Sequence, residues 1–188
     1  MIMLSFTARN HGSIRDEITL DLTKPSLRTL QPKDSRWADV TYPLAGIFGG
    51  NATGKSAIIN AISYAFAAIR RSATTWQAET PRMYRAPFLL DGTARTSSST
   101  YEIEFVYDER RHQYGFEVDY DGVKREWLRD IPTSRWRTLL DRDRDADILT
   151  FHSSLRTRIE VTDRELVLSR ALLLQDSALR AIAQDLAS

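Results

Sequence analysis

The sequence contains no cysteine, which excludes disulfide bonds and thiolate metal sites. It has no apolar run of the roughly 18 residues that a membrane span needs. The first residues lack the basic and apolar segments of a signal peptide. These absences predict a cytoplasmic protein that has no membrane partner. Lysine is also scarce, and occurs only at Lys24, Lys33, Lys55 and Lys124.

The charge balance is nearly neutral, with a formal net charge of +1. This argues against a strongly basic protein that coats nucleic acid, although it leaves a local basic groove open. The 188 residues suffice for one domain or for part of a larger one, and 42% of them are apolar, enough for a real core.

The first 71 residues are predicted to form two strands, a loop, a third strand and a helix. Residues 2–9 and 14–22 alternate between apolar and polar side chains, which predicts an antiparallel hairpin. Residues 23–40 are polar and contain two prolines, so we expect a loop. The apolar run 44–48 predicts a buried strand, and the apolar spacing over 56–71 predicts a helix.

The rest of the chain is predicted to be an irregular connection over 72–99, an antiparallel β-lobe over 100–152 and a helix over 163–187. Asp121-Gly122 is a strong tight-turn signal, because both central residues of such a turn need a positive φ. The expected strands of the β-lobe are residues 100–107, 112–120, 123–128, 135–140 and 147–151.

The segment Gly49–Ser56 reads GGNATGKS, a complete G-x-x-x-x-G-K-S pattern between the predicted third strand and the helix. Glycines allow successive N–H groups to point inward, and the helix N-terminus adds a positive dipole end. Lys55 would reach the β- and γ-phosphates of ATP as the catalytic cation, and the Ser56 hydroxyl would ligate Mg²⁺. The predicted nucleotide-binding residues are Gly49, Gly50, Asn51, Ala52, Thr53, Gly54, Lys55, Ser56 and Ala57.

Asparagine at the third position of this loop, Asn51, resembles the P-loops of the SMC, Rad50, RecF and OLD ATPases, the ABC-related branch. The chain also resembles the AAA15 family of ATPases in the order of its segments. These segments are, in turn, MLSFTARNHGSIRDEITLDL, AGIFGGNATGKSAIINAI, APFLLDG, YEIEFVYD, YGFEVD and REWL. The resemblance runs discontinuously from Met3 to about Trp136. It implies an α/β fold: a P-loop NTPase lobe of ABC-like type, with N-terminal antiparallel strands, a β-meander subdomain and a C-terminal helix.

The loop after the first strand departs from that family. Relatives carry Asn-Phe-Arg-Ser, with the arginine near the nucleotide, whereas this chain has Asn10-His11-Gly12-Ser13. Asn10 and Ser13 match, and Arg9 or Arg15 could substitute for the missing arginine. We expect His11 to be a solvated turn residue.

Hydrolysis by an ABC-type site also needs an apolar strand that ends in Asp-Glu and a signature segment. Asp108-Glu109 is a decoy, because strict alternation before it marks a half-exposed strand and DERR reads as a hairpin turn. The segment 172–177 does not fit the acidic strand, because its apolar residues have helical spacing. The segment 166–171 does not fit the signature segment, because it has no pair of glycines. None of Gln77, Gln113 and Gln175 stands out as the glutamine of a magnesium-linked loop.

We therefore expect this chain to be the N-terminal lobe of an ATPase whose C-terminal half lies outside it: a truncated piece, the ordered part of a longer protein, or a split gene product. Alone it should bind nucleotide better than it hydrolyses it. The helix over 163–187 has apolar residues on one face. That face either serves as an interface with the remaining half or a partner, or packs on this lobe's own core.

The segment 125–145 interleaves arginine and tryptophan, which invites a nucleic-acid interpretation. Its acidic residues neutralise the patch, so an exposed β-lobe with salt bridges is favoured. His11, His112 and His152 show no metal-ligand spacing.

The resemblance implies a homodimer that sandwiches ATP, switched by binding and hydrolysis, in bacterial anti-phage defence beside a separate effector nuclease or toxin. Two alternatives stay open. One is a DNA-maintenance ATPase like RecF or Rad50, which would bind DNA in a salt-dependent way. The other is a non-catalytic module that holds ATP to stabilise an assembly.

Overall fold

The computed structural model describes residues 1–50, 54–76, 85–175 and 177–187. Their centre is one seven-stranded sheet, antiparallel throughout, with the strand order β2-β1-β3-β4-β5-β6-β7. The strands are β1 (Ile2–Arg9), β2 (Ile18–Asp21), β3 (Ser99–Tyr107), β4 (Arg110–Val118), β5 (Val123–Asp130), β6 (Arg137–Asp143) and β7 (Ile148–Phe151). The predicted hairpin and β-meander are confirmed, although β2 is shorter than expected.

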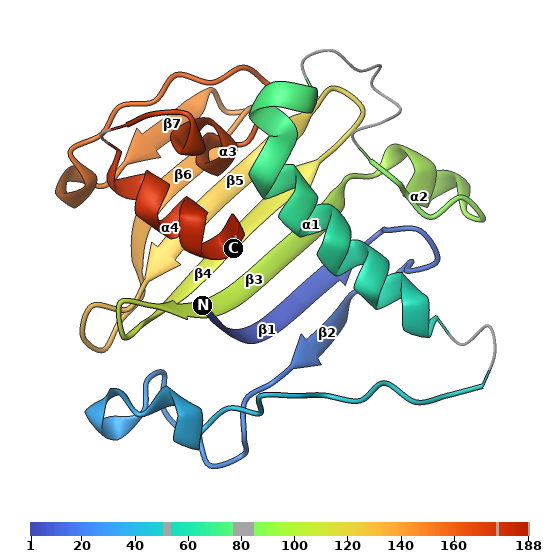
Figure 1. The fold of residues 1–188 in the computed structure, drawn as a ribbon. Coiled ribbons are helices and arrows are strands. Elements are labelled where there is room, and N and C mark those ends of the chain that lie inside the picture. The colour runs from blue at the N-terminus through green and yellow to red at the C-terminus, as the bar shows by residue number, and fades with distance from the viewer. Residues whose placement is uncertain (51–53, 77–84, 176, 188) are drawn as a thin grey trace.

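Helix α1 (Lys55–Thr75) crosses one face of the sheet, and α3 (Val167–Leu172) and α4 (Ala178–Ala187) lie on the same face (Figure 1). The buried face of α1 carries the small residues Ala61, Ala65 and Ala68, which let this helix approach the sheet closely. No helix of the described residues is long and apolar enough to cross a membrane.

Alternation along the central strands separates the two faces of the sheet. Tyr101, Ile103 and Phe105 of β3 are buried in the core under the helices. Between them, Glu102 and Glu104 lie on the opposite face, where Glu102 accepts a hydrogen bond from Trp127 Nε1 at 3.2 Å. The core therefore sits between the sheet and α1, α3 and α4, and positions the start of α1 at its border.

The predicted buried strand over 44–48 is wrong. The segment is extended but joins no strand ladder among the described residues, and the Leu44 and Phe48 side chains are 85% and 93% exposed. A strand is stable only when a neighbour pairs its backbone groups. In the described part of the chain the sheet ends at β2, so the apolar run has no neighbour of that kind.

The predicted single helix over 163–187 is also wrong, because it is divided into α3 and α4. Ser177 stands directly before α4, a position where serine favours the start of a new helix. Leu168, Leu179 and Leu186 are fully buried in the main core. Of the two alternatives, packing on this lobe's own core is the one that the structure shows.

Two further predictions of local structure need correction. The connection 72–99 is not wholly irregular, since α1 runs through Thr75 and the Asp91 side chain caps α2 (Gly92–Thr96) by accepting from Thr93 N and Ala94 N. Asp121-Gly122 does lie in the short turn that joins β4 to β5, as predicted, but of the two only Gly122 has a positive φ (136°). Two successive positive φ angles occur instead at Asp108 (49°) and Glu109 (60°), in the turn between β3 and β4.

Gly122 is required by its backbone angle and by the close approach of another segment. Gly122→Ala is therefore expected to lower the free energy of unfolding by about 2 kcal/mol. Its φ is +136°, and an added Cβ would lie 2.2 Å from the Asp163 carbonyl oxygen. That oxygen already accepts the Val123 N–H at 2.7 Å, so the two segments cannot separate freely. Urea denaturation would measure the loss. Gly92→Ala, where an added Cβ meets nothing within 4 Å, is the control and should stay within about 0.5 kcal/mol of wild type.

Candidate functional site

The start of α1 forms the centre of the candidate site. Gly54 occupies the N-cap position with φ +85°, a left-handed angle that glycine adopts without strain. The Lys55 side chain turns back over the preceding loop, where its Nζ donates to the Gly49 carbonyl at 2.7 Å and to the Gly50 carbonyl. The ammonium group therefore lies over the glycine-rich segment at the positive end of a 21-residue helix.

These residues fit a phosphate group. The N-cap residue Gly54 has no side chain that could cap α1, and the N–H groups at a helix N-terminus are donors that anions use. Open space surrounds Gly54, since an added Cβ would meet nothing within 4 Å. Ser56 is exposed beside it, and Ala57 is buried and donates its N–H to the Gly54 carbonyl at 2.9 Å. Asn51, Ala52 and Thr53 lie outside the described residues.

A serine hydroxyl also fits Mg²⁺, which takes oxygen ligands and shares them with phosphates and waters. The described residues contain no group of three or more His, Asp or Glu side chains arranged to hold a metal ion. In this part of the chain, Ser56 is thus the residue at the start of α1 that could bind the ion together with a phosphate.

Asp108-Glu109 takes no part in this site, as predicted. The pair forms the turn between β3 and β4, and the Glu109 carbonyl accepts a hydrogen bond from Trp37 Nε1 at 2.9 Å. Residues 166–171 are equally structural: they belong largely to α3, where Ser169 is buried and accepts the Ala73 N–H at 3.0 Å. Gln77 and Asp176 lie outside the described residues.

Asn10 anchors the loop that follows β1, a role that its sequence match did not specify. Its amide nitrogen donates to the carbonyls of Ala94, Ser97 and Ser98 at 2.7–3.2 Å. Its Oδ1 accepts the Phe88 N–H at 2.9 Å. Asn10 therefore fastens the segment 88–98 to the end of β1. The only sequence signal was an asparagine in a turn, a residue that tolerates positive φ, here 55°.

The prediction that His11 is a solvated turn residue is wrong. The side chain is buried, its Nδ1 lies 2.7 Å from the Tyr101 hydroxyl, and its ring centroid is 5.3 Å from that of Tyr64 on α1. The loop after β1 folds under the helix, which a polar turn sequence does not reveal. Burial lowers the pKa of the His11 imidazole, because the protein interior disfavours its charged form.

This burial predicts a loss of stability on acidification. The folded-state pKa of His11 lies below its unfolded value of about 6.5, so the unfolded chain binds more protons as the pH falls below that value. Stability should be fully present above pH 6.5 and should decrease below it, by at most about 1.4 kcal/mol per pH unit. Urea denaturation of wild type and His11→Gln between pH 7.5 and 5.5 measures this slope, which the variant should reduce. Equal slopes would contradict the assignment.

Arg9 and Arg15 were left open as replacements for the family's arginine. Arg15 forms an ion pair with Asp91 at 2.8 Å while 59% of its side chain stays exposed. Asp91 lies just before α2, so this pair joins the loop after β1 to α2 at the surface. Neither arginine forms a hydrogen bond or ion pair with the described residues at the start of α1, so a role for them at the nucleotide stays a prediction.

The arginine- and tryptophan-rich segment is an ion-paired surface of the β-lobe, as favoured from the sequence. Arg137 forms a bidentate pair with Asp130 at 2.9 and 2.5 Å. Arg125 lies 3.5 Å from Asp143. Carboxylates thus neutralise two of the guanidinium groups that single-stranded nucleic acid would need for its phosphates.

Comparison with protein families gives a match. A family model described as "AAA domain, putative AbiEii toxin, Type IV TA system" matches residues 44–186, more than half of the chain, with the glycine loop near the start of the match. A search of curated proteins finds no match.

Proposed function

This chain belongs to the family of AAA-type P-loop ATPase domains matched over residues 44–186, and from that premise we propose that it binds ATP with Mg²⁺ at the N-terminus of α1. The observation that carries the proposal is the position of Lys55. Its ammonium group donates to the Gly49 and Gly50 carbonyls directly before the N-terminus of α1. A phosphate chain laid on this loop would meet a cation, helix N–H groups and a hydroxyl together.

The residues divide the binding task between them. Lys55 would pair with the β- and γ-phosphates, where it also offsets charge that develops on the γ-phosphoryl group during transfer. Ser56 would hold Mg²⁺, which supplies neutralisation of phosphate charge when it is bound. Gly54, with its left-handed backbone, allows the chain to turn from the loop into the helix. Asn51, Ala52 and Thr53 join this set on the basis of the sequence pattern.

We further propose that the chain is an AAA15-type lobe that acts as a nucleotide-switched sensor or scaffold in a dimer, in anti-phage defence with a separate effector. The P-loop with asparagine at its third position and the order of the strand segments support this assignment. A type IV toxin–antitoxin description of the matched family is compatible with an effector partner. Asp108-Glu109 forms a hairpin turn and so does not supply the acidic strand end of a hydrolytic site.

A DNA-maintenance role receives less support. On the arginine- and tryptophan-rich face of the β-lobe, Arg125 and Arg137 are paired with carboxylates rather than open to phosphates. A protein that contacts several DNA phosphates loses affinity steeply with salt. DNA binding that requires Mg-ATP and shows such a salt dependence would favour this alternative over the sensor.

Isothermal titration calorimetry of the wild-type chain with Mg-ATP, beside Lys55→Ala, tests the proposal. We expect saturable binding by wild type that the variant loses. An absence of binding by wild type would reject this chain as a self-sufficient nucleotide-binding unit.

A further inference from the structure

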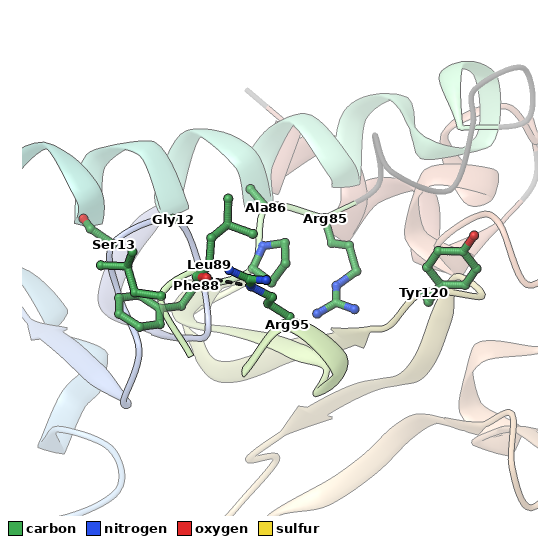
Figure 2. Close-up of a pocket in the computed structure, with 10 residues that line it drawn as sticks. Gly12, Ser13, Arg85, Ala86, Phe88, Leu89, Arg95 and Tyr120 are labelled. Atoms are coloured by element: carbon green, nitrogen blue, oxygen red, sulfur yellow. Dashed lines mark hydrogen bonds between the residues drawn. The ribbon is translucent and has the colours of Figure 1, made fainter. Parts of the chain in front are cut away.

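A cavity lies beside the loop after β1. It has a volume of about 960 Å³ and is bounded by the loop after β1, the segment 85–90, α2 and the turn after β4. This volume lies in the range of small-molecule sites. The residues that line it are different from those of the segment 49–57. Figure 2 shows the side chains of Arg85, Phe88, Arg95 and Tyr120 around this space.

The walls combine apolar surface with positive charge. Pro87, Phe88 and Leu89 supply a predominantly apolar lining, and two guanidinium groups, those of Arg85 and Arg95, face the same space. No carboxylate is among the described lining residues. A cavity with this composition favours a ligand that is apolar over most of its surface and negatively charged at one point.

Arg85 is the unusual member of this lining. Its side chain is only 9% exposed, yet the described residues offer it no ion pair. Its Nη2 donates to the Ser97 carbonyl, and its Nε is buried without a hydrogen-bond partner. Buried charges in proteins are normally paired. Arg85 therefore keeps an unbalanced positive charge beside the cavity, together with a buried Nε that has no acceptor.

The nearby acidic group does not remove this imbalance. The Asp119 carboxylate acts on Arg85 through its charge, but Arg144 holds both of its oxygens, one of them at 2.9 Å. Asp119 also accepts the backbone N–H groups of Asp121 and Gly122. Because its acceptor capacity is used, Asp119 is a partner of Arg144 rather than of Arg85.

We propose that this cavity binds a small organic anion, with an apolar body against Phe88 and Leu89 and a single negative charge on Arg85. The planar donors of a guanidinium group suit a carboxylate or sulfonate. Arg95 lies at the rim, where its Nε donates to the Leu89 carbonyl at 2.6 Å. It adds positive potential at the entrance. None of the residues described as lining this cavity belongs to the segment 49–57, so a competition experiment can separate this site from the proposed nucleotide site.

The test uses 8-anilinonaphthalene-1-sulfonate as a monoanionic probe and N-phenyl-1-naphthylamine as its neutral counterpart. Fluorescence titration of wild type should show one saturable sulfonate site. Arg85→Gln should weaken sulfonate binding about tenfold, because it removes a charged hydrogen-bond donor. Arg85→Lys should stay within about threefold of wild type because it retains the cation. Binding of the neutral probe should change less than about twofold in both variants, since the apolar walls remain.

Two further variants keep the result interpretable. Arg28→Gln removes an exposed arginine outside the cavity and should leave the sulfonate affinity unchanged. Leu89→Glu changes a side chain that is 60% exposed, so the fold should tolerate it while the new carboxylate repels the probe. Amide chemical shifts in ¹H–¹⁵N spectra should change at Gly12, Ala86 and Tyr120 when the probe binds.

Three outcomes would overturn the proposal. The first is equal sulfonate affinity in wild type and Arg85→Gln. The second is an equal loss of affinity for the neutral probe in Arg85→Gln. The third is competitive displacement of the sulfonate by Mg-ATP together with weaker Mg-ATP binding by Arg85→Gln, which would assign the cavity to the nucleotide. Failure of the chain to bind Mg-ATP would leave the sulfonate result unaffected, so the two proposals fail separately.

Discussion

Lys55→Ala is expected to reduce the affinity for Mg-ATP by at least about 100-fold, to below detection by calorimetry. The ammonium group is the charge that the described chain places over the glycine-rich loop, through its contacts with the Gly49 and Gly50 carbonyls. The helix N–H groups and the Ser56 hydroxyl remain in the variant, but they are neutral donors. They cannot replace a full charge against the phosphates.

The fold should not depend on the Lys55 side chain, so a loss of Mg-ATP affinity in Lys55→Ala can be assigned to the lost ammonium group rather than to unfolding. Lys55 is only partly buried, and the core contacts of α1 come from other residues such as Ala61 and Ile69. Lys33→Ala removes another lysine, exposed and distant in sequence, and should bind Mg-ATP as wild type does. Wild-type affinity in Lys55→Ala, at equal thermal stability, would show that the loop does not bind the phosphates.

Features set by local sequence were predictable. The period-two alternation of β3 placed Tyr101, Ile103 and Phe105 on one face, and the structure buries all three. The spacing of apolar residues located α1, and the glycine-lysine pattern located its start. The rejection of Asp108-Glu109 as an acidic strand end also followed from alternation alone, and the turn geometry confirms it.

Features set by long-range contacts were not predictable. Residues 44–48 are apolar enough for a strand, but an unpaired segment has no ladder to join, and composition does not reveal whether a neighbour exists. His11 looks like a turn residue until the loop after β1 meets Tyr64 and Tyr101 from other elements. The residues next to Arg85 in the sequence likewise give no sign that its side chain is buried, because the burial arises only in the folded chain.

Helix α1 connects these observations. Its N-terminus carries Lys55, its middle covers His11 through Tyr64, and its C-terminal turns contact α3. In that last contact the Ser72 hydroxyl accepts the Leu166 N–H at 3.0 Å. The residues that position α3 are therefore expected to support the orientation of α1, and so of the candidate nucleotide site, at a distance along the helix.

Glu126→Ala is expected to lower the free energy of unfolding by about 3–5 kcal/mol, the largest stability effect that we predict. Glu126 lies on β5 and is fully buried. It accepts the N–H groups of Val167 and Leu168 at 2.7 and 3.2 Å, and so caps α3, which has no cap of its own. Burial raises the pKa of this carboxyl, although Arg142, 3.7 Å away, favours its charged form.

The size of the effect follows from what the substitution leaves behind. Arg142 is 4% exposed and would lose a buried anionic partner, while the first N–H groups of α3 and the Tyr114 hydroxyl would lose their acceptor. Tyr114→Phe removes only the hydroxyl bond and should cost about 1 kcal/mol. Glu160→Ala, at an exposed glutamate, should stay within about 0.5 kcal/mol of wild type. Urea denaturation measures all three. A loss below 1 kcal/mol in Glu126→Ala would mean that α3 is held by its apolar contacts alone, and that the buried carboxylate is not what fixes it against α1.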